Sequence, residues 1–223
     1  FRVKGMIPCL WHPETGKISK LSYREVEQGT QVDLTMLPME AFFVVFRSSL
    51  PEGVTEEPSY ADWTPVQMVE KPWTIRFQAD RGAPADTTMA VLMSLTKSED
   101  EGIRYFSGMA SYHNQFTLTA KQLKAGRLAI DLGSVAGVAD VLVNGKHVTT
   151  LWHAPFLADI TDAVKIGDNT LEVKVSVLWR NRLIGDSKPD CKKRYGYTSY
   201  PFFKPNMSLH PSGLMGPVVL KQV

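Results

Sequence analysis

Apolar and polar residues alternate along several segments of the chain after Pro72. In "WTIRF" every second residue is apolar, and "RLAIDL" repeats the pattern further on. In "TLEVKVSVLW" the alternation is strict over five apolar positions, which are Leu171, Val173, Val175, Val177 and Trp179. Side chains two residues apart in a strand lie on the same face of a sheet. These segments are therefore predicted to be strands with one buried face, and Trp179 is expected to share that face.

Turn-forming residues separate these segments at short intervals. The pair Asn144-Gly145 lies between "VLV" and "KHVTTL", and Asn-Gly supplies the two positive φ angles of a type I′ hairpin turn. We expect this turn to be purely architectural. Only "TAKQLKAG" and "ITDAV" have the composition of a helical turn. Closely spaced strands with almost no helix predict an all-β fold, an antiparallel β-sandwich of the jelly-roll type over residues 72–223.

The first part of the chain shows a different organisation. Residues 1–50 contain a turn at "HPETGK", a hairpin with Gln28-Gly29 at its tip, and the apolar run "AFFVVFR", which predicts a strand buried on both faces. So few strands are marginally stable alone. We interpret residues 1–50 as the C-terminal strands of a preceding β domain, and Phe1 as a cut within a longer polypeptide. Residues 51–71, with prolines, acidic residues and little periodicity, are expected to be a linker.

Charge and cysteine content narrow the choice of partners. The 25 basic and 23 acidic residues give a net charge of +2, without long runs of one sign, so nucleic acid and anionic membranes are poor candidates. No stretch approaches the roughly 20 apolar residues of a membrane span. Cys9 and Cys191 are too few for a disulfide framework, and a bridge between them is not the favoured interpretation.

Candidate catalytic and metal-binding groups are sparse. The five histidines are scattered at spacings that fit no zinc pattern, and the glycines of "DLGSVAGVAD" precede no helix that could bind a nucleotide. Glycoside hydrolysis needs two carboxylates on opposite sides of a sugar bond, and the candidates by residue type are Asp159, Asp162, Asp168 and Asp186. The favoured alternative is that Asp159 and Asp162 cap a short turn. A calcium ion held by loop carboxylates and carbonyls stays an open alternative, without named ligands.

Aromatic and polar residues in three loops are the strongest candidates for contacts. Trp152 and His153 lie between two predicted strands, where binding residues often collect; a binding role and simple packing at the sheet edge are equally favoured for them. The loop after Trp179 crowds polar donors and acceptors, namely Arg180, Asn181, Arg182 and Asp186, which suit hydroxyl or carboxylate recognition or a domain interface. The segment "KKRYGYTSYPFFKP" adds Tyr195 and Tyr197, with Tyr200, Phe202 and Phe203, in a long loop that covers a sheet edge or lines a groove.

Several of these segments resemble one family. The chain is similar to the C-terminal galactose-binding-like jelly roll of bacterial glycoside hydrolases of the α-L-rhamnosidase type, family 106, which is related to the sugar-binding domain of glycoside hydrolase family 2. The resemblance is specific in "LWRNRLIGD" and "PSGLMGPV" and extends through "IRYFSGMASYHNQF" and "YPFFKPNMSLHPSGLMGPVVL". The front piece, "LWHPETGKISKLSYREVEQGTQVDLTMLPMEAFFVVFR", resembles the strand-rich segment that precedes this jelly roll.

The resemblance implies a non-catalytic role. In such enzymes the catalytic carboxylates and a calcium ion belong to a separate barrel, whose alternating strand-helix pattern is not found in this sequence, so no catalytic residue is assigned. We expect a monomeric ancillary domain of a periplasmic or extracellular enzyme, in contact with carbohydrate or with the enzyme's own catalytic domain. Arg180 and Arg182 would be donors, and Asp186 would be an acceptor or would orient the donors. An autonomous carbohydrate-binding module, with Trp152 and residues 195–203 as an aromatic platform, and a purely structural sandwich remain alternatives.

Overall fold

The computed structural model describes residues 1–55 and 63–223, which belong to two compact units, Phe1–Asp62 and Trp63–Val223. In the first unit, strands β2 (Ile18–Lys20), β1 (Ile7–Trp11) and β5 (Phe43–Arg47) form an antiparallel sheet in that order. Strands β3 (Tyr23–Val26) and β4 (Gly29–Val32) form a hairpin. The turn residues of this hairpin are 27 and 28, one position before the predicted tip.

Strand β5 corrects one prediction. The run "AFFVVFR" was expected to be buried on both faces, but β5 lies at an edge of its sheet and none of its residues is buried. Phe43 is 62% exposed. An apolar run specifies that a strand is hydrophobic, but it does not specify how many neighbours the strand has.

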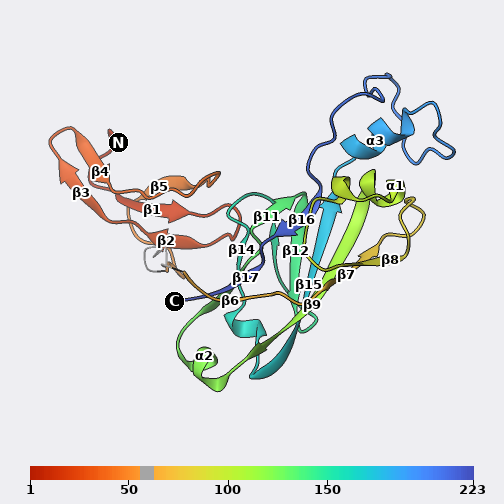
Figure 1. Ribbon diagram of the computed structural model, residues 1–223. Helices are drawn as coiled ribbons and strands as arrows, with labels where there is room; N and C mark the ends of the chain where they lie inside the picture. Colours follow the sequence, from red (N-terminus) through yellow and green to blue (C-terminus); the bar gives the residue numbers. More distant parts are fainter. Residues whose placement is uncertain (56–62) are drawn as a thin grey trace. The chain divides into compact units, whose positions relative to one another are not determined.

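The second unit is an antiparallel β-sandwich, as predicted (Figure 1). One sheet has six strands in the order β13-β12-β15-β9-β7-β8, and the other has four in the order β14-β10-β17-β6. Strands β11 and β16 form a short third pair. The bounds are β6 Thr64–Met68, β7 Trp73–Phe77, β8 Asp86–Met89, β9 Gly108–Leu118, β10 Leu128–Asp131, β11 Ser134–Ala136, β12 Val138–Val143, β13 Lys146–Leu151, β14 Leu157–Asp159, β15 Gly167–Val177, β16 Gly213–Gly216 and β17 Val219–Gln222.

The alternating segments form the core as their pattern predicts. In β7 the side chains of Trp73, Ile75 and Phe77 are buried and the two between them are exposed. Strand β15 buries Leu171, Val173, Val175 and Val177 in the same manner. These side chains share one hydrophobic cluster with Leu128, Ile130 and Leu220 of the four-stranded sheet. The two sheets therefore enclose a single apolar core.

The segment expected to be a linker contains a strand of this sandwich. Within residues 51–71, β6 pairs with β17, with Val219 opposite Met68. The second unit accordingly begins at Trp63, earlier than the predicted boundary at Pro72. Strand β6 lies at a sheet edge and its side chains are mostly exposed, so its sequence shows no alternation. The remainder of the expected linker includes residues 56–62, which lie outside the described residues.

The hairpin turn at Asn144-Gly145 is confirmed and has further structural partners. Asn144 and Gly145 have φ angles of 52° and 77°. The Asn144 amide nitrogen donates to the Ala163 carbonyl and to Asn169 Oδ1, at 2.9 and 2.8 Å. The backbone N–H of Thr170 donates to Asn144 Oδ1 at 3.1 Å. The turn therefore joins β12 and β13 and also fixes the loop that enters β15.

Helical structure is limited to short pieces between strands. Helix α2 (Ala120–Lys124) and the 3₁₀ turn Thr161–Ala163 occur where the sequence predicted helical turns. The turn Leu95–Lys97, helix α1 (Glu101–Arg104) and helix α3 (Arg180–Asp186) were not predicted. Among the described residues, no helix is long and apolar enough to cross a membrane.

Candidate functional site

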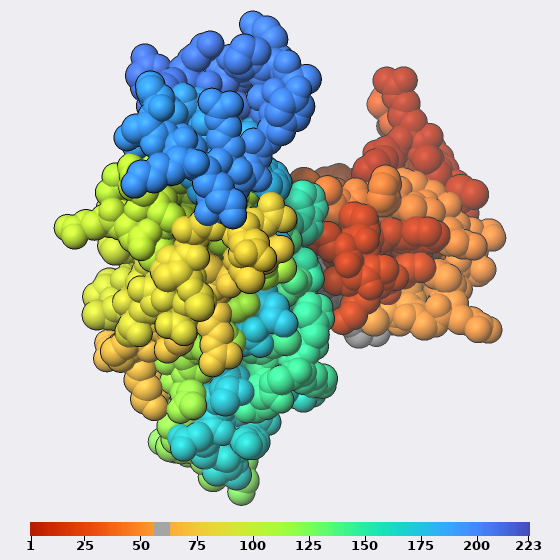
Figure 2. All heavy atoms as spheres, turned by 90° about the vertical axis from the view of Figure 1, so that its right-hand side faces the viewer, coloured from red at the N-terminus to blue at the C-terminus, as the bar shows by residue number. Residues whose placement is uncertain are grey.

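One end of the six-stranded sheet gathers most of the predicted contact residues. Strand β15 ends at Val177 opposite Gly108, where β9 begins. Ala139 pairs with both Leu151 and Val175, so β13 ends on the same side as β15. The segments that leave this end, which we call the α3 end, are residues 78–85, 99–107, 152–156 and 178–212. Figure 2 shows atoms of the last of these segments, in blue, gathered above the yellow and green atoms of the earlier ones.

Trp152 and His153 form an exposed pair at this end. The Trp152 side chain is 60% exposed, and its ring meets the His153 ring edge-on at 4.7 Å. His153 Nδ1 is 2.7 Å from the carbonyl oxygen of Ala154. The sheet register places this pair and α3 at the same end of the sheet. Their predicted contact role stays a prediction.

The segment "RNRLIGD" is a helix rather than the expected loop. Trp179 precedes α3 with a helical backbone and is 44% exposed, so the expectation that its ring lies in the core was wrong. The guanidinium of Arg81 lies over the Trp179 ring, 5.1 Å from its centroid. The core alternation of β15 therefore ends at Val177, and the chain then turns into the helix.

Helix α3 buries polar side chains. Its buried residues include Asn181, Arg182 and Asp186. The Asn181 amide donates to the carbonyl of His210 at 2.8 Å and accepts from the N–H of His210 at 3.0 Å. Arg180 is half-buried and borders a small hollow beside His210. Asn181 is thus a structural clamp on the chain that enters β16, and it is not available to a ligand.

Asp186 links α3 to the segment that follows it. Its Oδ2 accepts hydrogen bonds from the backbone N–H groups of Tyr195 and Gly196, at 2.8 and 2.7 Å. Its Oδ1 forms an ion pair with Arg182 Nε at 3.0 Å, between residues one helical turn apart. Both side chains are more than nine-tenths buried, at 7% and 5% exposure. The predicted acceptor role of Asp186 is therefore directed at the protein's own backbone.

Two hollows flank this linkage. The first, which we call the Tyr195 cleft, measures about 400 Å³ and is lined by Arg182, Tyr195 and Tyr105 together with Gly82, Glu101, Gly102, Gly185, Lys188, Asp190, Cys191, Lys192 and Lys193. Lys188 Nζ is 2.7 Å from Glu101 Oε1, and this contact, followed by one with Tyr105, raises the pKa of Lys188. The second hollow, about 340 Å³, lies against residues 194–205.

The segment from Tyr195 to Phe203 presents aromatic side chains to solvent. We call it the aromatic arm. Tyr197 is 90% exposed, Tyr200 72% and Phe202 55%. Phe202 and Phe203 meet edge-on at 5.2 Å, whereas Tyr195 is half-buried. Asp186 fixes the start of the arm through the backbone N–H groups of Tyr195 and Gly196.

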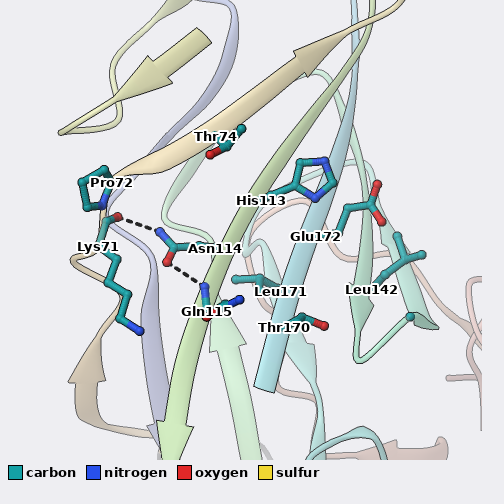
Figure 3. A pocket seen from close by; sticks show the side chains of 11 residues that line it. Lys71, Pro72, Thr74, His113, Asn114, Gln115, Leu142, Thr170, Leu171 and Glu172 are labelled. Carbon is teal, nitrogen blue, oxygen red and sulfur yellow. Dashed lines mark hydrogen bonds between the residues drawn. The ribbon is translucent and has the colours of Figure 1, made fainter. Parts of the chain in front are cut away.

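A larger hollow, about 570 Å³, lies on the outer face of the six-stranded sheet (Figure 3). His113 and Glu172, which are opposite each other on β9 and β15, project side by side into it with Thr74 near them. Burial lowers the pKa of His113, against the effect of the Glu172 carboxylate. The lining holds no Phe, Tyr or Trp ring. In the part of the chain that the structure describes, no group of three or more metal-ligating side chains was found.

The aspartates weighed as catalytic or capping residues have separate structural roles. Asp159 Oδ1 accepts from the Thr161 N–H at 3.0 Å, so it bonds to the backbone at the start of the 3₁₀ turn as expected, but it is not the N-cap residue, which is Ile160; its Oδ2 pairs with Arg127 at 2.6 Å. Burial raises the pKa of Asp159, but these hydrogen bonds outweigh it, so the net shift is downward. Asp162 lies within the 3₁₀ turn, which has no side-chain cap. Asp168 accepts a hydrogen bond from the Thr117 hydroxyl.

The two cysteines do not form a disulfide bond. Cys9 and Cys191 are both free thiols.

Sequence reasoning missed the residues that complete the Tyr195 cleft. Tyr105, Gly82 and Lys188 were not singled out, although the Arg182 guanidinium lies over the Tyr105 ring. Gly82 and Tyr105 precede α3 by more than 70 positions, and nothing in a single sequence pairs them with Tyr195. The available signal was local: "DCKKRYGY" places three cations beside aromatic residues.

Comparison with known proteins identifies the fold. Residues 94–204 match the family model described as "Glycosyl hydrolase 2 galactose-binding domain-like". The chain is 42% identical over 175 residues to a "Putative beta-glucuronidase" of Formosa agariphila, covering 68% of this chain and 15% of that protein. It is 32% identical over 98 residues to a β-glucuronidase of Chlorocebus aethiops, covering 41% of this chain and 15% of the relative.

Solved structures give the same result. A rhamnosidase from Novosphingobium sp. PP1Y superposes with a TM-score of 0.85 and 44% identity, over 100% of this chain and 21% of that one. A β-glucuronidase of Ruminococcus gnavus superposes with a TM-score of 0.51 and 20% identity, over 75% of this chain and 30% of that one, which shows a shared fold alone. The chain thus spans a small part of each relative, and it contains a galactose-binding-like domain similar to those of glycoside hydrolases.

Proposed function

We propose that this galactose-binding-like domain is a non-catalytic, ancillary domain of a secreted or periplasmic glycoside hydrolase of the α-L-rhamnosidase type. The domain docks on the catalytic barrel of the same polypeptide through the α3 end. The rhamnosidase assignment is supported by the 44% identity to the Novosphingobium enzyme, whose chain contains a counterpart of the whole of this one. The Formosa relative, described as a glucuronidase, makes β-glucuronides the alternative substrate class.

The observation that carries the docking role is the aromatic arm. Tyr197, Tyr200 and Phe202 are all more than half exposed, on a segment held at its start by Asp186. Exposed aromatic side chains close together favour a contact surface, because interfaces are enriched in such rings and their burial contributes strongly to binding. The arm itself carries no charged residue, so its aromatic rings would make its contacts with the barrel.

The test uses the full-length enzyme that contains this chain. We expect the double variant Tyr197→Ala/Phe202→Ala to lower kcat/KM for an aryl α-L-rhamnoside by roughly tenfold or more, because lost interface anchors each cost about 1–2 kcal/mol or more. Ile166→Ala is the matched control, since Ile166 is 59% exposed and precedes β15 at the opposite end. Unchanged activity and unchanged protease sensitivity in the double variant would contradict docking through the arm.

Substrate class is tested in the same preparations. Hydrolysis of the aryl α-L-rhamnoside and not of the aryl β-D-glucuronide supports the rhamnosidase assignment, and the reverse result replaces it. Hydrolysis of either substrate by the 223-residue chain alone would overturn the non-catalytic role.

A second candidate function is an autonomous carbohydrate-binding module. The observation in its favour is the Trp152 ring, which is 60% exposed and beside His153. Flat rings beside polar groups are suited to the apolar faces of sugars. Calorimetric titration of the chain with rhamnose-containing and galactose-containing pectin oligosaccharides tests this function: saturable binding that Trp152→Ala removes would support it. If the chain bound none of these oligosaccharides, and if the Tyr197→Ala/Phe202→Ala variant kept its activity, a purely structural role for the sandwich would be the supported alternative.

A further inference from the structure

The α3 end holds a further group that the docking proposal does not use, the guanidinium of Arg182. It lies between two tyrosine rings, 5.8 Å from the Tyr105 centroid and 5.1 Å from that of Tyr195. Its Nε is 3.0 Å from Asp186 Oδ1, and the side chain is 7% exposed. Stacking and the ion pair fix the plane of the guanidinium, so its donors point in set directions.

These donors are not used within the part of the chain that the structure describes. The Nε–Oδ1 contact is an ion pair without aligned hydrogen-bond geometry, because both atoms are buried without a hydrogen-bond partner. Neither Nη group of Arg182 donates a hydrogen bond to a described residue. Of the three guanidinium nitrogens, Nε is buried without a hydrogen-bond partner, and a buried donor without an acceptor costs about 1–3 kcal/mol. A guanidinium in this state is prepared for an acceptor that the chain itself does not supply.

Two glycines pack closely against the guanidinium and the two rings beside it. A Cβ at Gly82 would lie 3.2 Å from Arg182 Nη1, and one at Gly185 would lie 2.8 Å from Nη2. Gly82, Gly185 and Arg182 all line the Tyr195 cleft, so both Nη groups adjoin its wall. Any larger residue at either position would crowd the guanidinium. The absence of a side chain at both positions therefore allows the guanidinium to keep its place in the cleft wall.

The charge around the cleft favours an anion. Residues 180–196 contain six basic and two acidic residues, although the whole chain has a net charge of only +2. Lys188 is paired with Glu101, whereas Lys193 Nζ lies over the Tyr195 ring at 4.9 Å, at the cleft wall. Clustered cations raise the local concentration of anionic ligands.

We propose that the Tyr195 cleft binds the carboxylate of an acidic sugar, a hexuronate, with the two Nη groups of Arg182 as a bidentate donor pair. The arginine fork matches the two oxygens of a carboxylate. The exposed parts of the Tyr195 ring and the glycine backbone then meet the sugar ring, and Lys193 adds a second cation. A volume of about 400 Å³ holds a monosaccharide unit. The choice of a sugar rests on the proposed function; the choice of a carboxylate does not.

The test is calorimetric titration of the 223-residue chain with methyl β-D-glucuronide. Methyl β-D-glucoside has the same ring without the carboxylate, and sodium acetate has the carboxylate without the ring. We expect saturable binding of the glucuronide, roughly tenfold weaker binding or none for the glucoside, and weaker binding at high salt.

Variants locate the site. Arg182→Lys keeps the charge but removes the fork, and we expect it to lower affinity by roughly tenfold or more. Because Arg182 is buried, Lys193→Ala is the second variant; Lys193 is exposed, so this variant retains the fold, and affinity should fall several-fold. The control is Lys165→Ala, an exposed lysine just before β15 at the opposite end of the sheet.

Each outcome has one interpretation. Absence of glucuronide binding by the folded chain, or equal affinity of wild type and Lys193→Ala, overturns the proposal. Equal binding of glucoside and glucuronide overturns the role of the carboxylate, and equal binding of acetate and glucuronide overturns the role of the sugar. The docking experiments on the full-length enzyme use other residues and another readout, so either proposal can fail without the other.

Discussion

Replacement of Asp186 by alanine should release the aromatic arm from α3. The variant removes the acceptor of the Tyr195 and Gly196 N–H groups, at 2.8 and 2.7 Å, and the anionic partner of Arg182, at 3.0 Å. Arg182 then keeps its charge in a site where its side chain is 7% exposed. Removal of one partner from a buried ion pair costs about 3–5 kcal/mol, most of it for the charge left behind.

The size of the effect depends on how much of the chain responds. For a domain of about 150–250 residues, each kcal/mol lowers the melting temperature by about 2–4 °C, so a cooperative response would be a fall of roughly 6–20 °C. If the arm opens alone, the melting temperature changes less, and the same free energy appears as faster exchange of the Tyr195 and Gly196 amide hydrogens. At about 1.4 kcal/mol per factor of ten, the acceleration would be roughly 100-fold or more.

Two assays on the same samples distinguish these responses: thermal unfolding followed by circular dichroism, and hydrogen exchange of the two amides. Asp186→Asn retains an acceptor oxygen for the N–H groups but removes the charge, so we expect an intermediate effect. Asp190→Ala, an exposed aspartate of the same segment, is the matched control. If Asp186→Ala matched Asp190→Ala in both assays, the linkage between α3 and the arm would be refuted.

Three further predictions concern other sites of the second unit. Asn181→Ala removes both hydrogen bonds to the His210 backbone, at 2.8 and 3.0 Å, and should cost about 1–3 kcal/mol in urea unfolding; a change under 0.5 kcal/mol would contradict it. Gly213→Ala places a Cβ against the Tyr112 hydroxyl at a φ of +86°, so we expect at least about 2 kcal/mol of destabilisation, partly restored by Tyr112→Phe. Burial lowers the pKa of His113, so the unfolded chain binds a proton more readily than the folded one. The free energy of unfolding should therefore be constant above the unfolded pKa of about 6.5 and should fall as the pH drops below it. We expect the free energies of unfolding at pH 7.5 and pH 5.5 to differ less in His113→Gln than in wild type.

The sandwich was predictable because its strands bury one face. The alternation in β7 and β15 identifies strands whose inner residues, among them Ile75 and Val173, are fully buried. The Asn144-Gly145 pair identifies a hairpin because few other residues tolerate two consecutive positive φ angles. Both signals are local in the sequence and reflect burial or backbone geometry. They needed no knowledge of long-range contacts.

The edge strands and α3 were not predictable for two physical reasons. Edge strands such as β5 and β6 contact fewer neighbours. The number and spacing of their apolar residues therefore do not indicate which side chains are buried. Helix α3 buries Asn181, Arg182 and Asp186 instead of an apolar stripe, so the period of 3.6 residues that identifies an amphipathic helix is missing. The sequence therefore singled out residues that the structure brings together at this end, but their partners, such as His210 and Tyr105, came only from the fold.

Stability alone does not account for the polar composition of α3. A buried ion pair of the Arg182–Asp186 kind is often no more stabilising than well-packed apolar residues of similar volume, because each charge loses its hydration. Here the pair also lacks aligned hydrogen-bond geometry, so it recovers less of that loss than an ideal bidentate pair would. What the pair adds is direction: one Asp186 oxygen holds the start of the aromatic arm, and the guanidinium is held flat between two rings with its Nη groups beside the cleft. An apolar helix could support the sheet end equally well, but it could neither position the arm nor present a fork to an anion.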